Sequence, residues 1–252
     1  MFVLAGLGQK PEDIPIGTIK YIKKAGYVFL EYYTNVPNIR IERFLSKFRK
    51  DIKIVFRDFV ETKLEKFLLE HKKDLVVLLV FASPLFATTH TSLLSFCKEH
   101  KIKVRVIGAS SVYDYLAKTG LFIYKFGKTA SISFHKSKVP YDILKYNYMI
   151  GAHTLFLLDI DPENRRYMTV NEALIRLLEL EEEEKADIIN INSRVLICEK
   201  LGSENEKIYY VSIKKALDMV FNYPACIIFP VELNEIEKET LRYMSYYYED
   251  EE

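Results

Sequence analysis

The stretch Leu75-Val-Val-Leu-Leu-Val-Phe-Ala-Ser-Pro-Leu-Phe-Ala-Thr-Thr-His90 joins an unbroken apolar run, Leu75 to Phe81, to the start of a helix through a turn of small residues. A strand that is apolar without alternation is buried on both faces, as in a parallel sheet covered by helices. In open α/β sheets, ligands bind beyond the carboxyl ends of the strands, where small residues let backbone N–H groups approach them. The stretch therefore predicts an α/β fold with a ligand site at the turn that follows Phe81.

The same alternation of strands and helices extends through the first half of the chain. Segments whose apolar residues have helical spacing separate the apolar runs. One such segment places an apolar face among charged residues, formed by Val60, Leu64, Phe67 and Leu68. The predicted strands of this half are 2–7, 27–33, 75–81 and 104–107. This βαβ pattern predicts a parallel sheet.

The pattern restarts after the glycines Gly120 and Gly127. The predicted strands of the second half are 129–134, 153–160, 194–198, 207–211 and 225–229. Since no helix fits between 194–198 and 207–211, these two strands pair directly and the second sheet is mixed. We therefore predict two α/β domains, residues 1–115 and 116–252, that face each other across a cleft.

Composition limits the classes of partner. The 252 residues are 49% hydrophobic, and 36 Lys and Arg against 35 Asp and Glu give a formal net charge of +1. This balance argues against a general nucleic-acid or membrane-surface binder, and no apolar run reaches the roughly 20 residues of a membrane span. Three separated cysteines, Cys97, Cys198 and Cys226, lie in hydrophobic contexts. They indicate reduced core thiols and hence a cytoplasmic protein.

Several common catalytic motifs are missing from the sequence. Gly6-Leu-Gly8 is followed by Pro11 where a dinucleotide-binding fingerprint needs its third glycine, so we interpret these glycines as a tight strand-to-loop turn. The five histidines show no metal-ligand spacing, and we predict no metal site. His90 and His153 each adjoin a threonine at an element boundary, which favours caps or core hydrogen bonds over catalysis. Nucleophile-elbow and Cys-x-x-Cys patterns are also missing, so the sequence identifies no catalytic residue.

Six segments, taken in order, resemble the diphthine synthase family, methyltransferases of the tetrapyrrole methylase superfamily. They are Ala5–Gly8, Tyr27–Thr34, Pro84–His90, Gly120–Gly127, His153–Ile160 and Arg166–Ala173, and they span most of the chain. The last segment contains Thr169 and Glu172 at the spacing of a capping box, which independently predicts a helix start. The resemblance implies a homodimer of two tetrapyrrole-methylase-type α/β domains with S-adenosylmethionine in the cleft between them. It also implies methylation of the amine of a modified histidine on elongation factor 2.

The resemblance also implies which residues contact the cofactor. Carried over position by position, they are Gln9, Ser83, Phe86, Ser111, Val112, Leu158, Leu201 and Ala225. Methyl transfer from a sulfonium to an amine is an in-line displacement that chiefly needs alignment and exclusion of water, so neither a metal nor a covalent intermediate is implied. A carboxylate or water near the substrate nitrogen would help to remove its protons, and the sequence does not identify that base.

Several positions depart from the family pattern. Ser83, Gly108 and Ala225 replace an aspartate and two histidines, and the family's Trp-containing loop is shortened to 135–140 without Trp. These departures keep open a second hypothesis, a degenerate member that binds elongation factor 2 without methylating it. A third hypothesis, methylation of a tetrapyrrole or another small molecule, is compatible with the shared fold.

Overall fold

A computed structural model describes residues 1–35 and 41–249. Contacts within the chain divide it into two compact units. The first comprises Met1–Asp114 with Pro162–Arg165, and the second comprises Tyr115–Asp161 with Arg166–Glu252.

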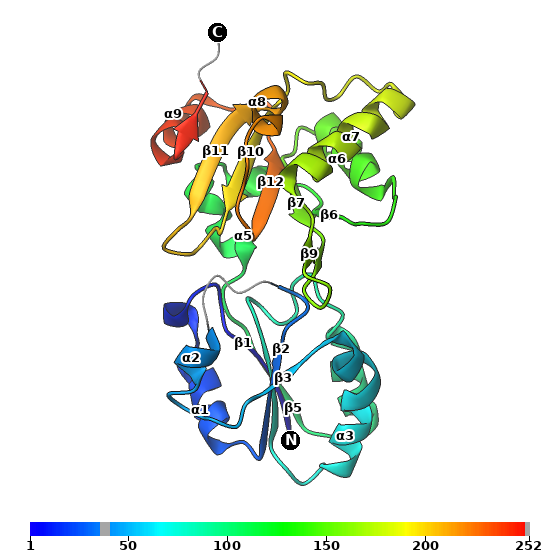
Figure 1. Ribbon diagram of the computed structural model, residues 1–252, viewed down its shortest axis with the longest axis vertical. Coiled ribbons are helices and arrows are strands. Elements are labelled where there is room, and N and C mark those ends of the chain that lie inside the picture. Colours follow the sequence, from blue (N-terminus) through cyan, green and yellow to red (C-terminus); the bar gives the residue numbers. More distant parts are fainter. Residues whose placement is uncertain (36–40, 250–252) are drawn as a thin grey trace. The chain divides into compact units, whose positions relative to one another are not determined.

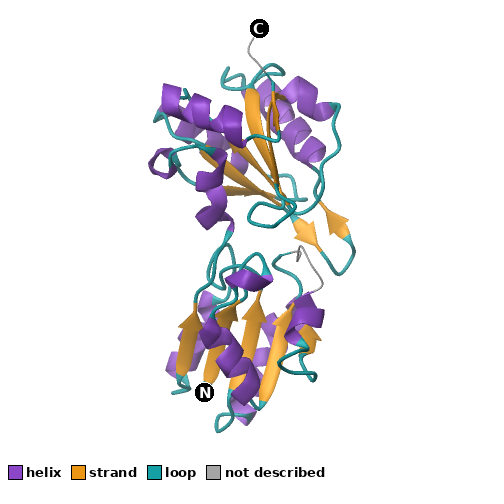
Figure 2. Ribbon diagram, turned by 90° about the vertical axis from the view of Figure 1, so that its left-hand side faces the viewer, coloured by secondary structure: helices purple, strands orange, loops and turns teal. Residues whose placement is uncertain are grey.

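The first unit contains a five-stranded parallel sheet of strand order β3-β2-β4-β1-β5. Figure 2 shows the strand arrows around the N-terminus pointing the same way. Its strands are β1 (Phe2–Gly6), β2 (Tyr27–Glu31), β3 (Lys53–Val55), β4 (Val76–Val80) and β5 (Val104–Ile107). Its helical segments are η1 (Pro11–Asp13), α1 (Ile16–Lys24), α2 (Ile41–Leu45), η2 (Phe59–Lys63), α3 (Leu64–Glu70), α4 (Thr91–Glu99) and the start of α5 (Val112–Tyr115).

Both faces of this sheet are buried, which explains the unbroken apolar runs. Phe2 and Leu4 belong to a core cluster with residues of α3 and α4, whereas Val3 and Ala5 belong to a second cluster with residues of α1 and α2. In Figure 1, α1 and α2 lie on one side of the strands and α3 on the other. Alternate residues of one strand therefore fill two cores, so no position along it can be polar.

The second unit contains a six-stranded mixed sheet of strand order β13-β11-β10-β12-β7-β6. Its strands are β6 (Ala130–Ile132), β7 (Thr154–Leu158), β10 (Arg194–Glu199), β11 (Lys207–Ser212), β12 (Ala225–Phe229) and β13 (Tyr247–Tyr248), and β8 (Ile160–Asp161) pairs separately with β9 (Arg166–Tyr167). Its helical segments are η3 (Leu116–Thr119), η4 (Ile123–Lys125), α6 (Val139–Met149), α7 (Val170–Glu184), α8 (Ile213–Leu217) and α9 (Glu235–Met244). A single core cluster packs residues of α6, α7 and α8 against this sheet.

The α/β class and the mixed second sheet are confirmed, since β10 and β11 pair antiparallel across their full length. The capping box is also present, with Thr169 accepting from the Glu172 backbone and Glu172 accepting in return. The sequence interpretation missed β3, β8, β9 and β13, because strands of two or three residues leave too few apolar positions to form a pattern.

Candidate functional site

The carboxyl edge of the first sheet gathers five of the predicted cofactor contacts. Strand β1 lies between β4 and β5, with Gly6 opposite Val80 and Ala5 opposite Ile107. The turns after these three strands are therefore neighbours. They carry Gln9, Ser83, Phe86, Ser111 and Val112. This is the position at which parallel α/β sheets bind ligands.

Glycines allow the three turns to approach one another closely. A Cβ added at Gly6 would lie 2.6 Å from the Ala82 carbonyl oxygen and 2.8 Å from the Ala109 Cβ. Gly8 adopts φ +73 and forms an isolated antiparallel bridge with Ala82. The tight turn predicted from Gly6-Leu-Gly8 is thus confirmed. Glycine is needed at these positions because a side chain would clash with the neighbouring turns.

Two carboxylates hold the polar groups of this edge in place. Asp13 accepts hydrogen bonds from the Gln9 backbone N–H at 3.1 Å and from the Ser110 hydroxyl at 2.6 Å. Asp114 accepts from the Ser111 backbone N–H at 2.6 Å and from its hydroxyl at 2.9 Å. The sequence interpretation missed both. The Ser111-x-x-Asp114 spacing at a helix start was the available signal for the second.

The side chains at this edge offer an aromatic wall beside open space. The Phe86 ring meets the Tyr113 ring edge to face at a centroid distance of 4.2 Å, and burial raises the pKa of the Tyr113 hydroxyl. Ser83 is half-buried in the same turn. A Cβ added at Gly108 would meet no described atom within 4 Å. The edge therefore presents aromatic rings, whose faces attract cations such as a sulfonium.

The other three predicted contacts gather at one edge of the second sheet. Ala225 pairs with Glu199 at the end of β10, and Cys226 pairs with Leu157, so Ala225 also lies beside Leu158. Leu201 follows in the turn after β10 and is 5% exposed. Leu158 and Ala225 thus lie beside each other and pack against the core of the second unit, with the buried Leu201 in the adjoining turn, and the three form an apolar group around this strand end.

Hydrogen bonds fix the turns around this apolar group. The Lys200 backbone N–H donates to the Pro224 carbonyl at 2.7 Å. The buried Glu199 carboxylate accepts from the Asn222 backbone N–H at 2.7 Å. Gly202 adopts φ +89, and a Cβ there would lie 2.5 Å from the Tyr115 ring. Sequence reasoning missed Glu199, because a lone acidic residue at the end of an apolar strand gives no local signal.

The two singled-out histidines are both buried and hydrogen-bonded. His153 Nδ1 accepts from the Val231 backbone N–H at 3.0 Å, and Nε2 donates to Glu237 at 3.1 Å. Burial lowers the pKa of His153, which is consistent with this neutral form. His90 lies in the first unit, 1% exposed, with Nδ1 bonded to the Pro84 carbonyl at 3.0 Å. Neither imidazole is exposed enough to act directly on a substrate.

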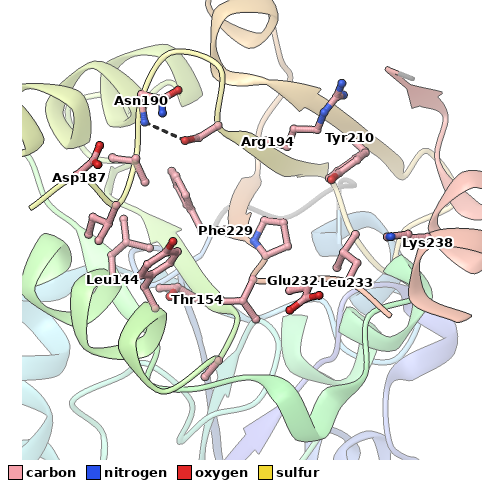
Figure 3. Close-up of a pocket in the computed structure, with 17 residues that line it drawn as sticks. Leu144, Thr154, Asp187, Asn190, Arg194, Tyr210, Phe229, Glu232, Leu233 and Lys238 are labelled. Carbon is pink, nitrogen blue, oxygen red and sulfur yellow. Dashed lines mark hydrogen bonds between the residues drawn. The ribbon is translucent and has the colours of Figure 1, made fainter. Parts of the chain in front are cut away.

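A separate cavity of about 610 Å³ lies in the second unit (Figure 3). Its lining includes Thr154, Arg194 and Phe229, which are the first residue of β7, the first of β10 and the last of β12. These are the opposite strand ends from those near Leu158 and Ala225. This cavity is therefore remote from the predicted cofactor contacts of the second unit.

Within 1–35 and 41–249, no three His, Cys, Asp or Glu side chains gather as metal ligands would. The helices of this part of the chain include none that is long and apolar enough to cross a membrane.

Comparison with known proteins yields consistent matches over the whole chain. Residues 1–217 match the family model of Tetrapyrrole (Corrin/Porphyrin) Methylases. The chain is 38% identical over 251 residues to a diphthine synthase of Methanococcus aeolicus, covering 97% of this chain and 98% of the relative. A crystal structure of diphthine synthase superposes with a TM-score of 0.87 at 27% identity, covering 98% and 97% of the two chains. The crystal structure of a putative diphthine synthase from Entamoeba histolytica gives a TM-score of 0.85 at 28% identity, covering 97% and 98%.

Proposed function

Because the chain belongs to the tetrapyrrole methylase family and, within it, to the diphthine synthases, we infer that it is an S-adenosylmethionine-dependent methyltransferase of diphthamide biosynthesis. Its substrate is elongation factor 2, and the methyl acceptor is the amine of the modified histidine. The observation that carries this function is the gathering of the turns after β4, β1 and β5 at one sheet edge, on a chain matched over nearly its full length.

We propose that this edge binds the cofactor through Gln9, Ser83, Phe86, Ser111 and Val112. The Gln9 and Ser111 backbone N–H groups are already held by Asp13 and Asp114, so these turns are rigid before a ligand arrives. Rigid turns reduce the entropy lost on binding. The two carboxylates also give this edge negative charge, which favours a cationic ligand.

We further propose that Leu158, Leu201 and Ala225 contact the apolar part of the same cofactor. Leu158 and Ala225 lie side by side on β7 and β12, and Leu201 follows the end of β10, the strand that pairs with β12, which supports a shared role. Bound adenosylmethionine would supply a methyl group on a sulfonium, whose neutral thioether is a good leaving group. The residues named here bind and orient, so that binding geometry contributes most of the catalysis.

The identity of the group that receives the amine proton is left to experiment. The carboxylates of Asp13 and Asp114 are engaged by hydrogen bonds from the protein, which makes them positioning groups. Water at the edge is the proton acceptor that we propose.

We also propose that the chain is a cytoplasmic homodimer. Support comes from the end of α6, where Tyr148, Met149 and Ile150 are 52%, 75% and 57% exposed. A contiguous run of large exposed apolar side chains is typical of protein interfaces. Sedimentation at micromolar concentration tests this, and a monomer throughout would contradict it.

Incubation of the purified chain with adenosylmethionine and elongation factor 2 carrying the diphthamide precursor tests the function. Mass spectrometry of the peptide with the modified histidine should show added methyl groups, and S-adenosylhomocysteine should inhibit. Tight binding of S-adenosylhomocysteine would exclude the degenerate hypothesis, which rests on the altered cofactor positions. Failure of both binding and transfer would overturn the proposed function.

A further inference from the structure

A buried acid–base pair lies beneath the predicted cofactor turn of the first unit. Glu31 ends β2 and His90 precedes α4, and both side chains are 1% exposed. His90 Nε2 lies 2.5 Å from Glu31 Oε2. This contact is not aligned as a straight hydrogen bond, so it is a close ion pair. An isolated charge is not stable when buried this deeply, so a charge on one side chain must be compensated by the opposite charge on the other.

The contacts around the pair determine where its protons lie. The Pro84 carbonyl can only accept, so His90 Nδ1 carries a hydrogen and donates to it at 3.0 Å. Glu31 Oε1 accepts from the Thr34 backbone N–H at 3.1 Å and from the Thr34 hydroxyl. A lone pair on Nε2 facing a carboxylate oxygen at 2.5 Å would be strongly repulsive. Nε2 therefore carries a second ring proton, which makes His90 an imidazolium ion-paired with the Glu31 carboxylate.

The Pro84 carbonyl connects this pair to the cofactor edge. It also accepts from the Thr88 hydroxyl at 2.8 Å, so two side chains fix one peptide of the turn. The Pro84 ring in turn lies against β1, because a Cβ added at Gly6 would be 3.0 Å from its Cδ. Ser83 precedes this proline, and the Phe86 backbone N–H donates to the Ser83 carbonyl at 3.3 Å.

We propose that Glu31 and His90 form a positioning pair in which the charged His90 ring holds the Ser83–Phe86 turn in the shape that binds adenosylmethionine. This rests on the proposed function. The pair does not touch substrate, and it acts through the Pro84 carbonyl. Loss of the proton leaves the Nε2 lone pair against the Glu31 carboxylate, and His90 must then withdraw and release Pro84.

Other charged and titratable groups face the pair. Tyr33 places its hydroxyl 3.5 Å from His90 Nε2, and Arg57 lies over the Tyr33 ring at 5.2 Å. Glu61 and Glu65 line a small hollow together with His90. Burial by itself lowers the pKa of His90, but the Glu31 carboxylate, the Pro84 carbonyl and Glu61 outweigh it and raise the pKa above 6.5. Burial and the nearby carboxylates raise the pKa of Tyr33, so its hydroxyl stays neutral.

The direction of the pH effect follows from this raised pKa. A histidine whose pKa is raised in the folded protein stabilises the fold fully at a pH below its ordinary pKa. This stabilisation is lost as the pH rises through the folded-state pKa. Affinity for S-adenosylhomocysteine should therefore fall by about tenfold as the pH rises above 6.5 and His90 loses its proton.

Glu31→Gln is the decisive variant. Thr34 bonds Oε1, so the amide oxygen of Gln stays there and its NH₂ group faces His90 Nε2. The amide can donate to a neutral imidazole, which keeps Nδ1–H on Pro84 at every pH. We expect wild-type affinity with no pH dependence. His90→Ala should raise the KM for adenosylmethionine about tenfold with kcat little changed.

His100→Gln is the matched control. His100 follows the other end of α4, and its Nδ1 bonds the Phe96 carbonyl at 3.1 Å, a comparable local hydrogen bond remote from Pro84. This variant should keep both the affinity and the pH profile of the wild type.

Nitrogen-15 spectra of the histidines test the pair without reference to activity. In the wild type at pH 7, both His90 nitrogens should show imidazolium shifts, whereas in Glu31→Gln they should show a neutral ring protonated at Nδ1. A neutral His90 in the wild type would contradict the proposed ion pair between a charged His90 and Glu31. A charged His90 together with a flat affinity profile would overturn the positioning role, and a wild type that binds no S-adenosylhomocysteine at any pH would overturn the proposed function instead.

Discussion

Replacing Gly6 by alanine tests whether the three turns of the first unit act as one cofactor-binding edge. The added Cβ would lie 2.6 Å from the Ala82 carbonyl oxygen, 2.8 Å from the Ala109 Cβ and 3.0 Å from the Pro84 Cδ. Ordinary contacts begin near 3.4 Å. The Ala82 backbone must therefore move by about 0.8 Å, since neither it nor the Ala109 Cβ is a flexible side-chain end.

The displacement should affect stability and binding together. Overpacking of this size costs about 1–3 kcal/mol of unfolding free energy. A shift of nearly 1 Å in the turns that carry Gln9, Ser83 and Ser111 should weaken binding of S-adenosylhomocysteine about tenfold to a hundredfold. Urea unfolding measures the first quantity and calorimetric titration measures the second.

Gly26→Ala is the control, because it makes the same substitution at the opposite edge of the same sheet. Its Cβ would lie 3.6 Å from the Leu75 carbonyl oxygen and 3.8 Å from the Asp74 Cβ, which are ordinary contacts. Both stability and affinity should match the wild type. If Gly6→Ala also binds S-adenosylhomocysteine like the wild type, the proposed edge is not where the cofactor lies.

Three further predictions concern single side chains. Ser83→Asp should tighten adenosylmethionine binding about tenfold through charge-assisted hydrogen bonds, whereas unchanged affinity in calorimetry would show that Ser83 does not face the cofactor. Burial raises the pKa of Glu237, but the hydrogen bonds from Lys125, Phe122, His153 and Asn234 prevail and hold it at about 2. The resulting stability is present above pH 4.5 and is lost as the pH falls toward 2, so urea unfolding should show a steeper loss for wild type than for Glu237→Gln. Burial raises the pKa of the Cys97 thiol to about 11, so Cys97 in the folded protein should not react with a thiol reagent at pH 8, and prompt labelling of it would refute this burial.

Local patterns in the chain were enough to predict its longer strands, a helix start and its family. The run from Leu75 to Phe81 predicted a buried parallel strand, because a strand covered on both faces cannot alternate with polar residues. Thr169 and Glu172 predicted a helix start that the structure confirms, because a capping box is made within four residues. The ordered segments pointed to the diphthine synthases, which the comparisons support.

Contacts between residues distant in sequence depend on the order and register of the strands, which local patterns do not give. Strand order β3-β2-β4-β1-β5 places β1 between β4 and β5, and local periodicity reports which faces are buried but not which strands are neighbours. That order brings Asp13 to Ser110, 97 residues away, and sets Glu31 against His90. A lone carboxylate or histidine has no periodic pattern of its own. Its partner is fixed only when the register of the sheet aligns the ends of the strands that carry them.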